Sequence, residues 1–175
     1  MPMKAIVYCD YGTADELRLE DVEQPVPGDD ELLVRVHAAG VNPLDWHYMR
    51  GTPYLMRLSS GLRKPKDTRL GVDYAGTVEA VGAEVTGFAA GDRVMSSCSV
   101  ADGTCVYCNE GLSSSCQSWS LFGWAARVWQ QGGAVQGGQS EFVRVPLADA
   151  TLHKMPESLA GEENEAKLLP LVDVM

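Results

Sequence analysis

Three cysteines lie close together in the second half of the chain, at Cys105, Cys108 and Cys116. Two thiolates separated by two residues can face one metal ion because the chain turns tightly between them, and a third from beyond a short loop can close a tetrahedron. Residues 103–118 are otherwise polar and lack the periodicity of a helix or a strand. This pattern predicts a compact lobe tied by one zinc ion, in preference to three free thiols.

A tetrahedral zinc site needs a fourth ligand, and two residues are candidates. Asp102 extends the pattern to Asp-x2-Cys-x2-Cys-x7-Cys, and a carboxylate oxygen is an acceptable zinc ligand. Cys98 offers a softer donor, but it lies further back, on the strand expected after Gly91, so Asp102 is preferred. With all four positions filled by protein, none is open to water, and the predicted zinc is structural and not catalytic.

Frequent turns shape the rest of the chain, which contains 18 Gly and 9 Pro residues. Pro fixes φ and Gly tolerates positive φ, so these residues break the chain into short elements. The apolar or alternating segments between them predict short strands at residues 3–8, 17–22, 32–41, 76–82, 93–95 and 140–145. One helical turn is expected at 45–50, an exposed loop at 55–68, and a helix at 159–175. The expected fold is mostly β, a partly closed barrel or sandwich with minor helices.

Charge and hydropathy exclude two classes of partner. The net charge is −10, and no stripe of Lys and Arg could overcome the repulsion between such a surface and a phosphate backbone. No stretch approaches the ~18 apolar residues of a membrane span, and the N-terminal run is too short for a signal peptide. We therefore expect a cytoplasmic protein with no nucleic-acid or membrane partner, in which thiols stay reduced and free to bind metal.

Several long segments resemble one enzyme superfamily. Residues 31–46, 71–82 and 87–94 are similar to the quinone oxidoreductase branch of the medium-chain dehydrogenase/reductase superfamily. Residues 97–116 and 138–146 resemble its zinc-containing alcohol dehydrogenase branch instead. The resemblance covers almost the whole chain and joins features of two branches.

The resemblance implies a two-domain enzyme of which this chain is the first part. Residues 1–157 are expected to form a GroES-like, alcohol-dehydrogenase-type catalytic domain, with the zinc lobe at about residues 98–118. Residues 158–175 resemble the start of the helix that leads into a Rossmann domain for NAD(H) or NADP(H). No Gly-x-Gly-x-x-Gly sequence follows a strand here, so the Rossmann domain is expected to be absent from this chain.

The zinc-containing branch also has a catalytic metal, bound by a Cys, a His and a third Cys or Asp. These positions align here with Asn42, Val72 and Asp173. An amide and an aliphatic side chain cannot replace the Cys and His ligands, so no catalytic zinc is expected. The chain follows the zinc-free pattern at these positions.

In the enzymes that the chain resembles, a nicotinamide cofactor supplies the hydride in a cleft between two domains. Asn42 and Asp45 are candidate catalytic residues: Asn42 would hold the nicotinamide or the substrate carbonyl, and Asp45 would fix the loop. His47 or Tyr48 is the candidate proton donor, and Tyr48 joins Asn42 as a candidate contact of the cofactor. The alternatives are that Asn42 and Asp45 only cap the turn after Val41, and that His47 is a surface or packing histidine.

The leading hypothesis is the catalytic-domain portion of an NAD(P)-dependent oxidoreductase, inactive alone, whose substrate is a small carbonyl, alcohol or quinone compound. The full enzyme would bind NAD(P), whereas this chain would bind it only weakly. The alternative is a free-standing or engineered GroES-like zinc-binding module with a scaffold or interaction role. Without a second domain, an apolar face would be exposed and self-association is expected, through Leu168, Leu169, Leu171 and Val172.

Overall fold

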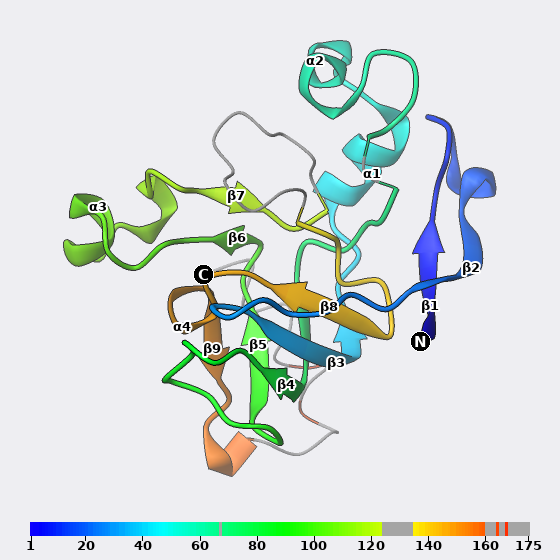
Figure 1. Cartoon of the computed structure of the whole chain (residues 1–175). Coiled ribbons are helices and arrows are strands. Elements are labelled where there is room, and N and C mark those ends of the chain that lie inside the picture. The colour runs from blue at the N-terminus through cyan, green and yellow to red at the C-terminus, as the bar shows by residue number, and fades with distance from the viewer. Residues whose placement is uncertain (67, 124–134, 160–163, 165–166, 168–175) are drawn as a thin grey trace.

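The computed structural model describes residues 1–66, 68–123, 135–159, 164 and 167, and Figure 1 labels its elements. Short strands carry most of the regular backbone among these residues. They are β1 Pro2–Val7, β2 Arg18–Glu23, β3 Leu32–Ala39, β4 Tyr74–Val81, β5 Arg93–Ser96, β6 Ser99–Val100, β7 Ser120–Leu121, β8 Phe142–Val145 and β9 Leu152–Lys154. This mostly β architecture confirms the expected fold class.

The central sheet has five strands in the order β8-β3-β4-β5-β9, and each neighbouring pair is antiparallel. The strand β3 lies inside the sheet, where Leu32 faces Val145 of β8 on one side and Val81 of β4 on the other. Every strand pairing among the described residues is antiparallel, so they include no parallel sheet of the kind that binds dinucleotides.

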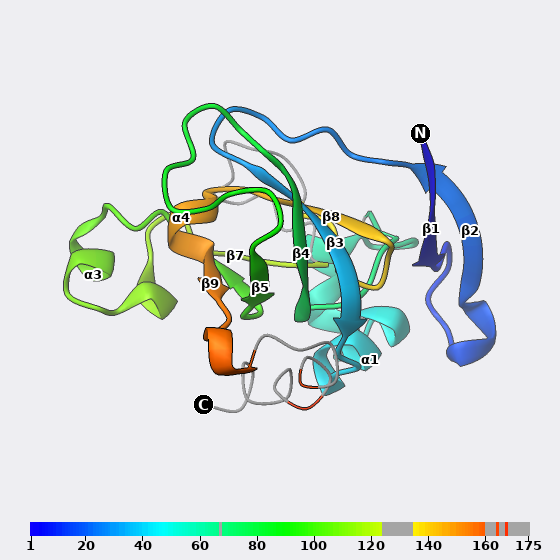
Figure 2. The same ribbon diagram turned by 90° about the horizontal axis from the view of Figure 1, so that it is seen from below.

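Two hairpins, each a separate two-stranded sheet, flank this sheet at opposite sides, as Figures 1 and 2 show. The hairpin β1–β2 joins it through an isolated bridge between Ala5 and Ser140, just before β8, and Ile6 N–H donates to the Gln139 carbonyl at 2.9 Å. The hairpin β6–β7 carries the cysteine-rich excursion, which projects away from the body on the other side. The central sheet and the two flanking hairpins together form the partly closed barrel that the turn pattern predicts.

The helices are short and lie in the connections. The longest is α1, Pro43–Arg50, which begins with Pro in its first turn and ends at Gly51 in the left-handed conformation (φ 59°) that glycine tolerates best. The others are α2 Arg57–Ser60, α3 Val106–Asn109, α4 Ala148–Thr151 and the 3-10 turns η1 Ala14–Glu16, η2 Tyr54–Met56, η3 Ser113–Ser115 and η4 Glu157–Leu159. Within the described part of the chain, no helix has both the length and the apolar character needed to cross a membrane.

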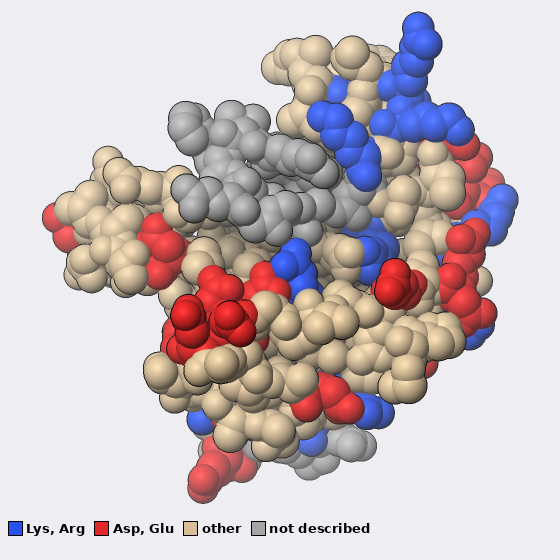
Figure 3. All heavy atoms as spheres, viewed as in Figure 1, with Lys and Arg blue, Asp and Glu red and all other residues tan. Residues whose placement is uncertain are grey.

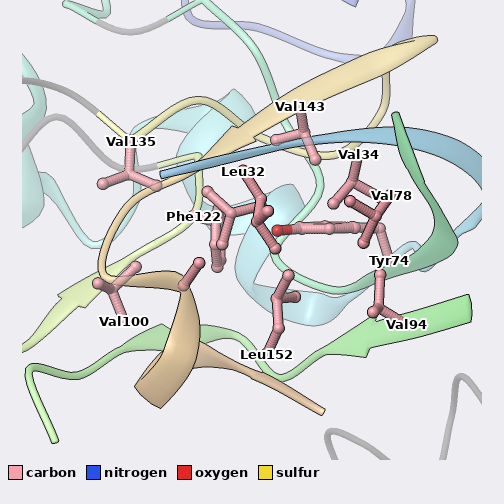
Figure 4. Packing of buried hydrophobic residues seen from close by; sticks show 12 residues of the cluster. Leu32, Val34, Tyr74, Val78, Val94, Val100, Phe122, Val135, Val143 and Leu152 are labelled. Carbon is pink, nitrogen blue, oxygen red and sulfur yellow. The ribbon is translucent and has the colours of Figure 1, made fainter. Parts of the chain in front are cut away.

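Two groups of buried residues hold the elements together. The larger fills the barrel (Figure 4), where the Tyr74 and Phe122 rings meet edge to face with centroids 5.1 Å apart. It comprises Leu32, Val34, Tyr74, Val78, Val94, Val100, Phe122, Val135, Val143, Val145, Ala148 and Leu152. The smaller lies beneath α1 and comprises Tyr8, Tyr48, Met49, Leu70 and Val72. Each large apolar side chain buried in this way contributes roughly 1.5–3 kcal/mol.

Most expected strands appear within one or two residues of their predicted bounds, but two segments differ. Residues 55–68 were expected to form only a loop, yet they contain parts of η2 and the whole of α2. The single turn expected at residues 45–50 is a two-turn helix that begins at Pro43. Most of the predicted helix at 159–175 lies outside the described residues, including the predicted apolar face at Leu168, Leu169, Leu171 and Val172.

Candidate functional site

The four predicted zinc ligands meet in the excursion between β6 and β7, here called the cysteine lobe (residues 101–119). The ligand atoms of Asp102, Cys105, Cys108 and Cys116 all lie within 4.8 Å of one another. Cys105 immediately precedes α3 and Cys108 lies within it, so one turn of helix aims both thiols at the same point. Cys116 is buried where the chain returns toward β7. One carboxylate and three thiols in this geometry match a tetrahedral zinc site.

Hydrogen bonds within the lobe orient the candidate ligands. The Asp102 carboxylate accepts the backbone N–H groups of Cys105 at 2.9 Å and Thr104 at 2.8 Å. These bonds hold the pKa of Asp102 well below its usual range, so the group is ionised at neutral pH. The Cys116 sulfur accepts the N–H groups of Asp102 at 3.2 Å and Ser118 at 3.3 Å. Such contacts to ligand atoms fix their direction before a metal binds.

The thiols themselves show why this arrangement suits a cation. Backbone N–H groups of Gln117 and Cys108 lower the pKa of the Cys105 thiol. Desolvation, together with the nearby sulfurs of Cys105 and Cys116, raises the pKa of Cys108 to about 12. Three thiolates and a carboxylate repel one another at this separation, and a bound divalent cation removes the repulsion.

The alternative ligand Cys98 lies elsewhere. It packs against the residue cluster beneath α1 and is not a member of the group of metal-ligand side chains found among the described residues. The reason is topological: Cys98 precedes β6, whereas the other candidates follow that strand. The geometry therefore favours Asp102 as the fourth ligand, and zinc binding by either set stays a prediction.

The first two candidate catalytic residues meet at the beginning of α1. The Asn42 side chain donates through Nδ2 to Asp73 Oδ1, and Asp73 is only 2 % exposed. The Asp45 carboxylate accepts the N–H of Asn42 at 3.0 Å and that of Gly71 at 2.8 Å, so it ties the helix to the segment before β4. Asp45 thus does act as a cap, as the alternative interpretation expected, and it also fixes a second loop.

His47 and Tyr48 point in different directions from α1. The His47 Nδ1 atom lies 2.7 Å from the Thr52 carbonyl oxygen, which can only accept, so Nδ1 carries the proton and Nε2 is the remaining ring nitrogen. Tyr48 is only 3 % exposed, within the cluster beneath α1. Burial, with smaller effects from Asp45 and Cys98, raises the pKa of the Tyr48 phenol. The predicted roles of both residues stay predictions.

Of the three positions aligned with a catalytic metal, two lie among the described residues. Asn42 is engaged with Asp73, Val72 is buried at 1 % exposure, and Asp173 lies outside the described residues. Sequence reasoning missed the contact between Asn42 and Asp73, which lie 31 residues apart. The available signal was the acidic residue directly after Val72, but only the pairing of distant segments shows which side chain it meets.

The comparisons with known proteins agree with this architecture. The profile of the alcohol dehydrogenase GroES-like domain matches residues 28–157. The chain belongs to the GroES-like alcohol dehydrogenase family. Within the medium-chain dehydrogenase/reductase superfamily it is 32 % identical over 181 residues to a zinc-type alcohol dehydrogenase-like protein of Bacillus subtilis. That alignment covers 99 % of this chain and 43 % of the relative.

Two further relatives represent the quinone oxidoreductase branch and the alcohol dehydrogenase branch. A human quinone oxidoreductase is 36 % identical over 107 residues, which are 60 % of this chain and 30 % of that protein. A cobalt- and zinc-bound alcohol dehydrogenase from Pyrobaculum aerophilum superimposes with a TM-score of 0.67 at 31 % identity, over 83 % of this chain and 40 % of that structure. This alcohol dehydrogenase domain therefore spans less than half the length of the relatives that it matches.

Proposed function

We propose that this chain is the catalytic-domain portion of a zinc-binding, NAD(P)-dependent oxidoreductase that acts on a small carbonyl, alcohol or quinone compound. The observation that carries the proposal is the network at the beginning of α1, where Asp73 orients Asn42 and Asp45 ties the helix to Gly71. A nicotinamide site needs such rigid positioning from the protein, because the cofactor supplies the reactive hydride. The family match supports the same reading, and a cytoplasmic location fits it.

The zinc ion in this proposal is structural. Asp102, Cys105, Cys108 and Cys116 supply all four ligands of a tetrahedron, so no position is left for water or substrate. The lobe has few buried apolar residues of its own, since most of its side chains outside the ligand set are exposed. Metal binding then supplies the folding energy that a small core cannot.

Substrate activation falls to protein side chains, because Asn42 and Val72 cannot hold a catalytic zinc. The Asn42 amide donates one N–H to Asp73, and its Oδ1 accepts the N–H of Asp45 in the capping box. Its second N–H and the other lone pair of Oδ1 are the groups that can hold the nicotinamide or the substrate carbonyl. When protonated, His47 can donate from Nε2 while Nδ1 stays bonded to the Thr52 carbonyl. Tyr48 would act on the cofactor or the substrate only from its buried position beneath α1.

The test of this proposal is a saturation-transfer NMR measurement of NADH and NADPH with the purified chain. We expect weak binding in which the nicotinamide protons are saturated more than the adenine protons, because the chain lacks a glycine-rich pyrophosphate turn. Asn42→Ala should abolish the nicotinamide effect, while Asp15→Ala, a substitution of an exposed side chain in η1, should keep it. Equal saturation of both rings, or no change in Asn42→Ala, would contradict the proposal.

The same reasoning predicts that this chain alone does not turn over. Hydride transfer requires the reacting atoms to be held within roughly 3–3.5 Å, which weak cofactor binding does not achieve. Steady-state oxidation of NADH or NADPH by a quinone should therefore be undetectable with the purified chain. Turnover that depends on the chain and is lost in Asn42→Ala would show that this half of the site suffices.

A further inference from the structure

The segment that follows α1 exposes an unusual set of large apolar side chains. Residues 52–66, here called the α2 lobe, contain η2 and α2. Four of its side chains are between 66 % and 74 % exposed: Tyr54, Leu55, Leu58 and Leu62. Single exposed leucines are common on protein surfaces, whereas several large apolar side chains exposed close together, here within residues 54–62, are typical of binding surfaces.

The α2 lobe is held firmly although its outer side is apolar. The Arg57 side chain donates to the Gly51 carbonyl at 2.9 Å and lies over the Tyr11 ring, 4.3 Å from its centroid. The Tyr11 hydroxyl donates to the Gly61 carbonyl at 2.7 Å and lies 3.1 Å from Ser60 Oγ. These contacts with Tyr11 and Gly51 hold the backbone of the α2 lobe in place, so the exposed leucines have a defined position.

Positive charge surrounds this apolar surface, although the whole chain carries −10. Figure 3 shows Lys and Arg side chains gathered over α2 and the loop that follows it. Three basic side chains in this loop are exposed: Arg63, Lys64 and Lys66. Lys64 also pairs with Asp10 at 3.1 Å, but the net charge of the loop stays positive. An apolar surface bordered by cations suits a ligand with an apolar body and an anionic group.

The α2 lobe adjoins the candidate active site. It follows α1 directly (Figure 1), and the His47 ring reaches it through the Thr52 carbonyl at 2.7 Å. The two-turn helix α1 is about 12 Å long, so the lobe lies one short helix away from Asn42 at the other end. A molecule of modest length can therefore contact the lobe and the Asn42 side of the site together.

We propose that the α2 lobe is the substrate-docking face of this site and that it binds an apolar molecule bearing a carboxylate or phosphate group. The inference rests on the proposed function, whose substrate class it narrows. The apolar body packs against Leu55 and Leu58, and the anionic group lies near Arg63 and Lys64. A neutral alcohol or quinone gains only the apolar contact. A second copy of the lobe is a poor occupant, because its own cations would repel these.

The test compares octanoate with 1-octanol, which have the same chain length and differ in charge. Each is titrated into the purified, isotopically labelled chain while backbone amide chemical shifts are followed. We expect octanoate to shift amides of residues 52–66 and of α1, and to bind up to about fivefold more tightly than octanol. Arg63→Gln should reduce this preference, and Leu58→Ala should weaken both ligands. Arg18→Gln and Leu19→Ala on β2 are matched controls and should change neither.

Several outcomes would overturn the proposal. Equal affinity for the two ligands, or shifts confined to residues outside the α2 lobe and α1, would remove its basis. Binding to vesicles of anionic phospholipid that is lost in Arg63→Gln, without any response to octanoate, would make the lobe a membrane-docking surface. Dimerisation lost in Leu58→Ala would make it an interface between copies. No nicotinamide is present in this titration. A negative result would therefore overturn the docking proposal alone, and the proposed contact between Asn42 and the nicotinamide is tested by the saturation-transfer measurement.

Discussion

In the cysteine lobe, spacing along the sequence determines some candidate ligands, and packing between distant segments determines another. Cys105 and Cys108 are brought together by one turn of α3, and their spacing alone is enough to predict this. Asp102 and Cys98 are chemically comparable candidates in the sequence. The fold separates them, because Cys98 packs against the cluster beneath α1 while Asp102 reaches the thiols.

Substitutions of these two residues should therefore have unequal effects on metal content. Asp102→Ala removes a ligand and also frees the N–H groups of Thr104 and Cys105, so we expect most of the bound zinc to be lost. Cys98→Ala should leave about one zinc per chain. Elemental analysis of protein purified without chelator measures both. A larger loss in Cys98→Ala would reverse the assignment of the fourth ligand.

Asp149 is a residue whose contribution to stability should depend on pH. Its carboxylate accepts the N–H and hydroxyl of Thr86 at 3.0 and 2.8 Å and the N–H of Gly87 at 2.8 Å. These bonds, chiefly that from the Thr86 N–H, lower the pKa of Asp149 below its ordinary value of 3.8. Because the folded pKa is the lower one, the stabilisation is complete well above pH 3.8 and disappears as the pH falls through the folded pKa.

Asp149→Asn should accordingly be less stable than the wild type at pH 7, by no more than about 1 kcal/mol because the side chain is exposed. Urea unfolding at a series of pH values measures the difference, which should shrink as the pH falls below 3.8 and through the folded pKa. Asp15→Asn, at the exposed η1, provides the control. A difference that stays constant from pH 7 to pH 3 would contradict the assigned cause.

At the scale of elements, α1 shows how a short helix is specified and then used. Asn42, Pro43 and Asp45 form a recognisable helix start, and Gly51 provides the stop. The helix gains its function from contacts beyond itself: Asp45 to Gly71, and Asn42 to Asp73. The residues Asn42 and Asp45 therefore predict the start of the helix from local sequence. Their partners Asp73 and Gly71 lie in the segment before β4, which local sequence does not reveal.

Removing the Asp45 carboxylate should weaken this element. In Asp45→Ala the buried N–H of Gly71 loses its partner and the start of α1 loses its cap, so we expect about 2 kcal/mol of lost stability. Asp45→Asn keeps one acceptor oxygen and should lose less. Denaturant unfolding of the three proteins gives the ranking. Equal stability of Asp45→Ala and the wild type would show that this anchor is dispensable.

At the scale of the whole molecule, the barrel and the cysteine lobe are stabilised by different means. The strands of the barrel are held together by pairing between distant segments, such as Leu32 with Val145, around a continuous apolar core. The cysteine lobe projects from that body (Figure 2), and most of its non-ligand side chains are exposed. Its shape would then depend on the metal, and that of the barrel would not.

Removal of zinc should therefore unfold the molecule locally before it unfolds globally. With a chelator present, we expect amide hydrogen exchange to accelerate in residues 101–119 while β3 and β4 stay protected. The thermal midpoint should also fall, since a ligand at a thousand times its dissociation constant stabilises by about 4 kcal/mol. Uniform acceleration across the barrel, or an unchanged midpoint, would contradict a structural role confined to the lobe.

The sequence alone was enough for the features that depend on neighbouring residues. Strand positions follow from short-range alternation, the candidate metal donors from the Cys105–Cys108 spacing, and the family from long continuous segments. Residues 55–68 were misjudged because their charges and serines predict a loop, while the helix α2 is stabilised by contacts such as Ser60 with Tyr11, 49 residues away.

Only the tertiary structure decided the features that depend on residues far apart in the chain. It brought Asp102 and not Cys98 to the thiols, joined Asn42 to Asp73, buried Tyr48 and left the leucines of the α2 lobe exposed beside its cations. The physical reason is the same in each case. Local propensity acts over a few residues, whereas strand pairing and core packing select which of many chemically equivalent partners a side chain meets.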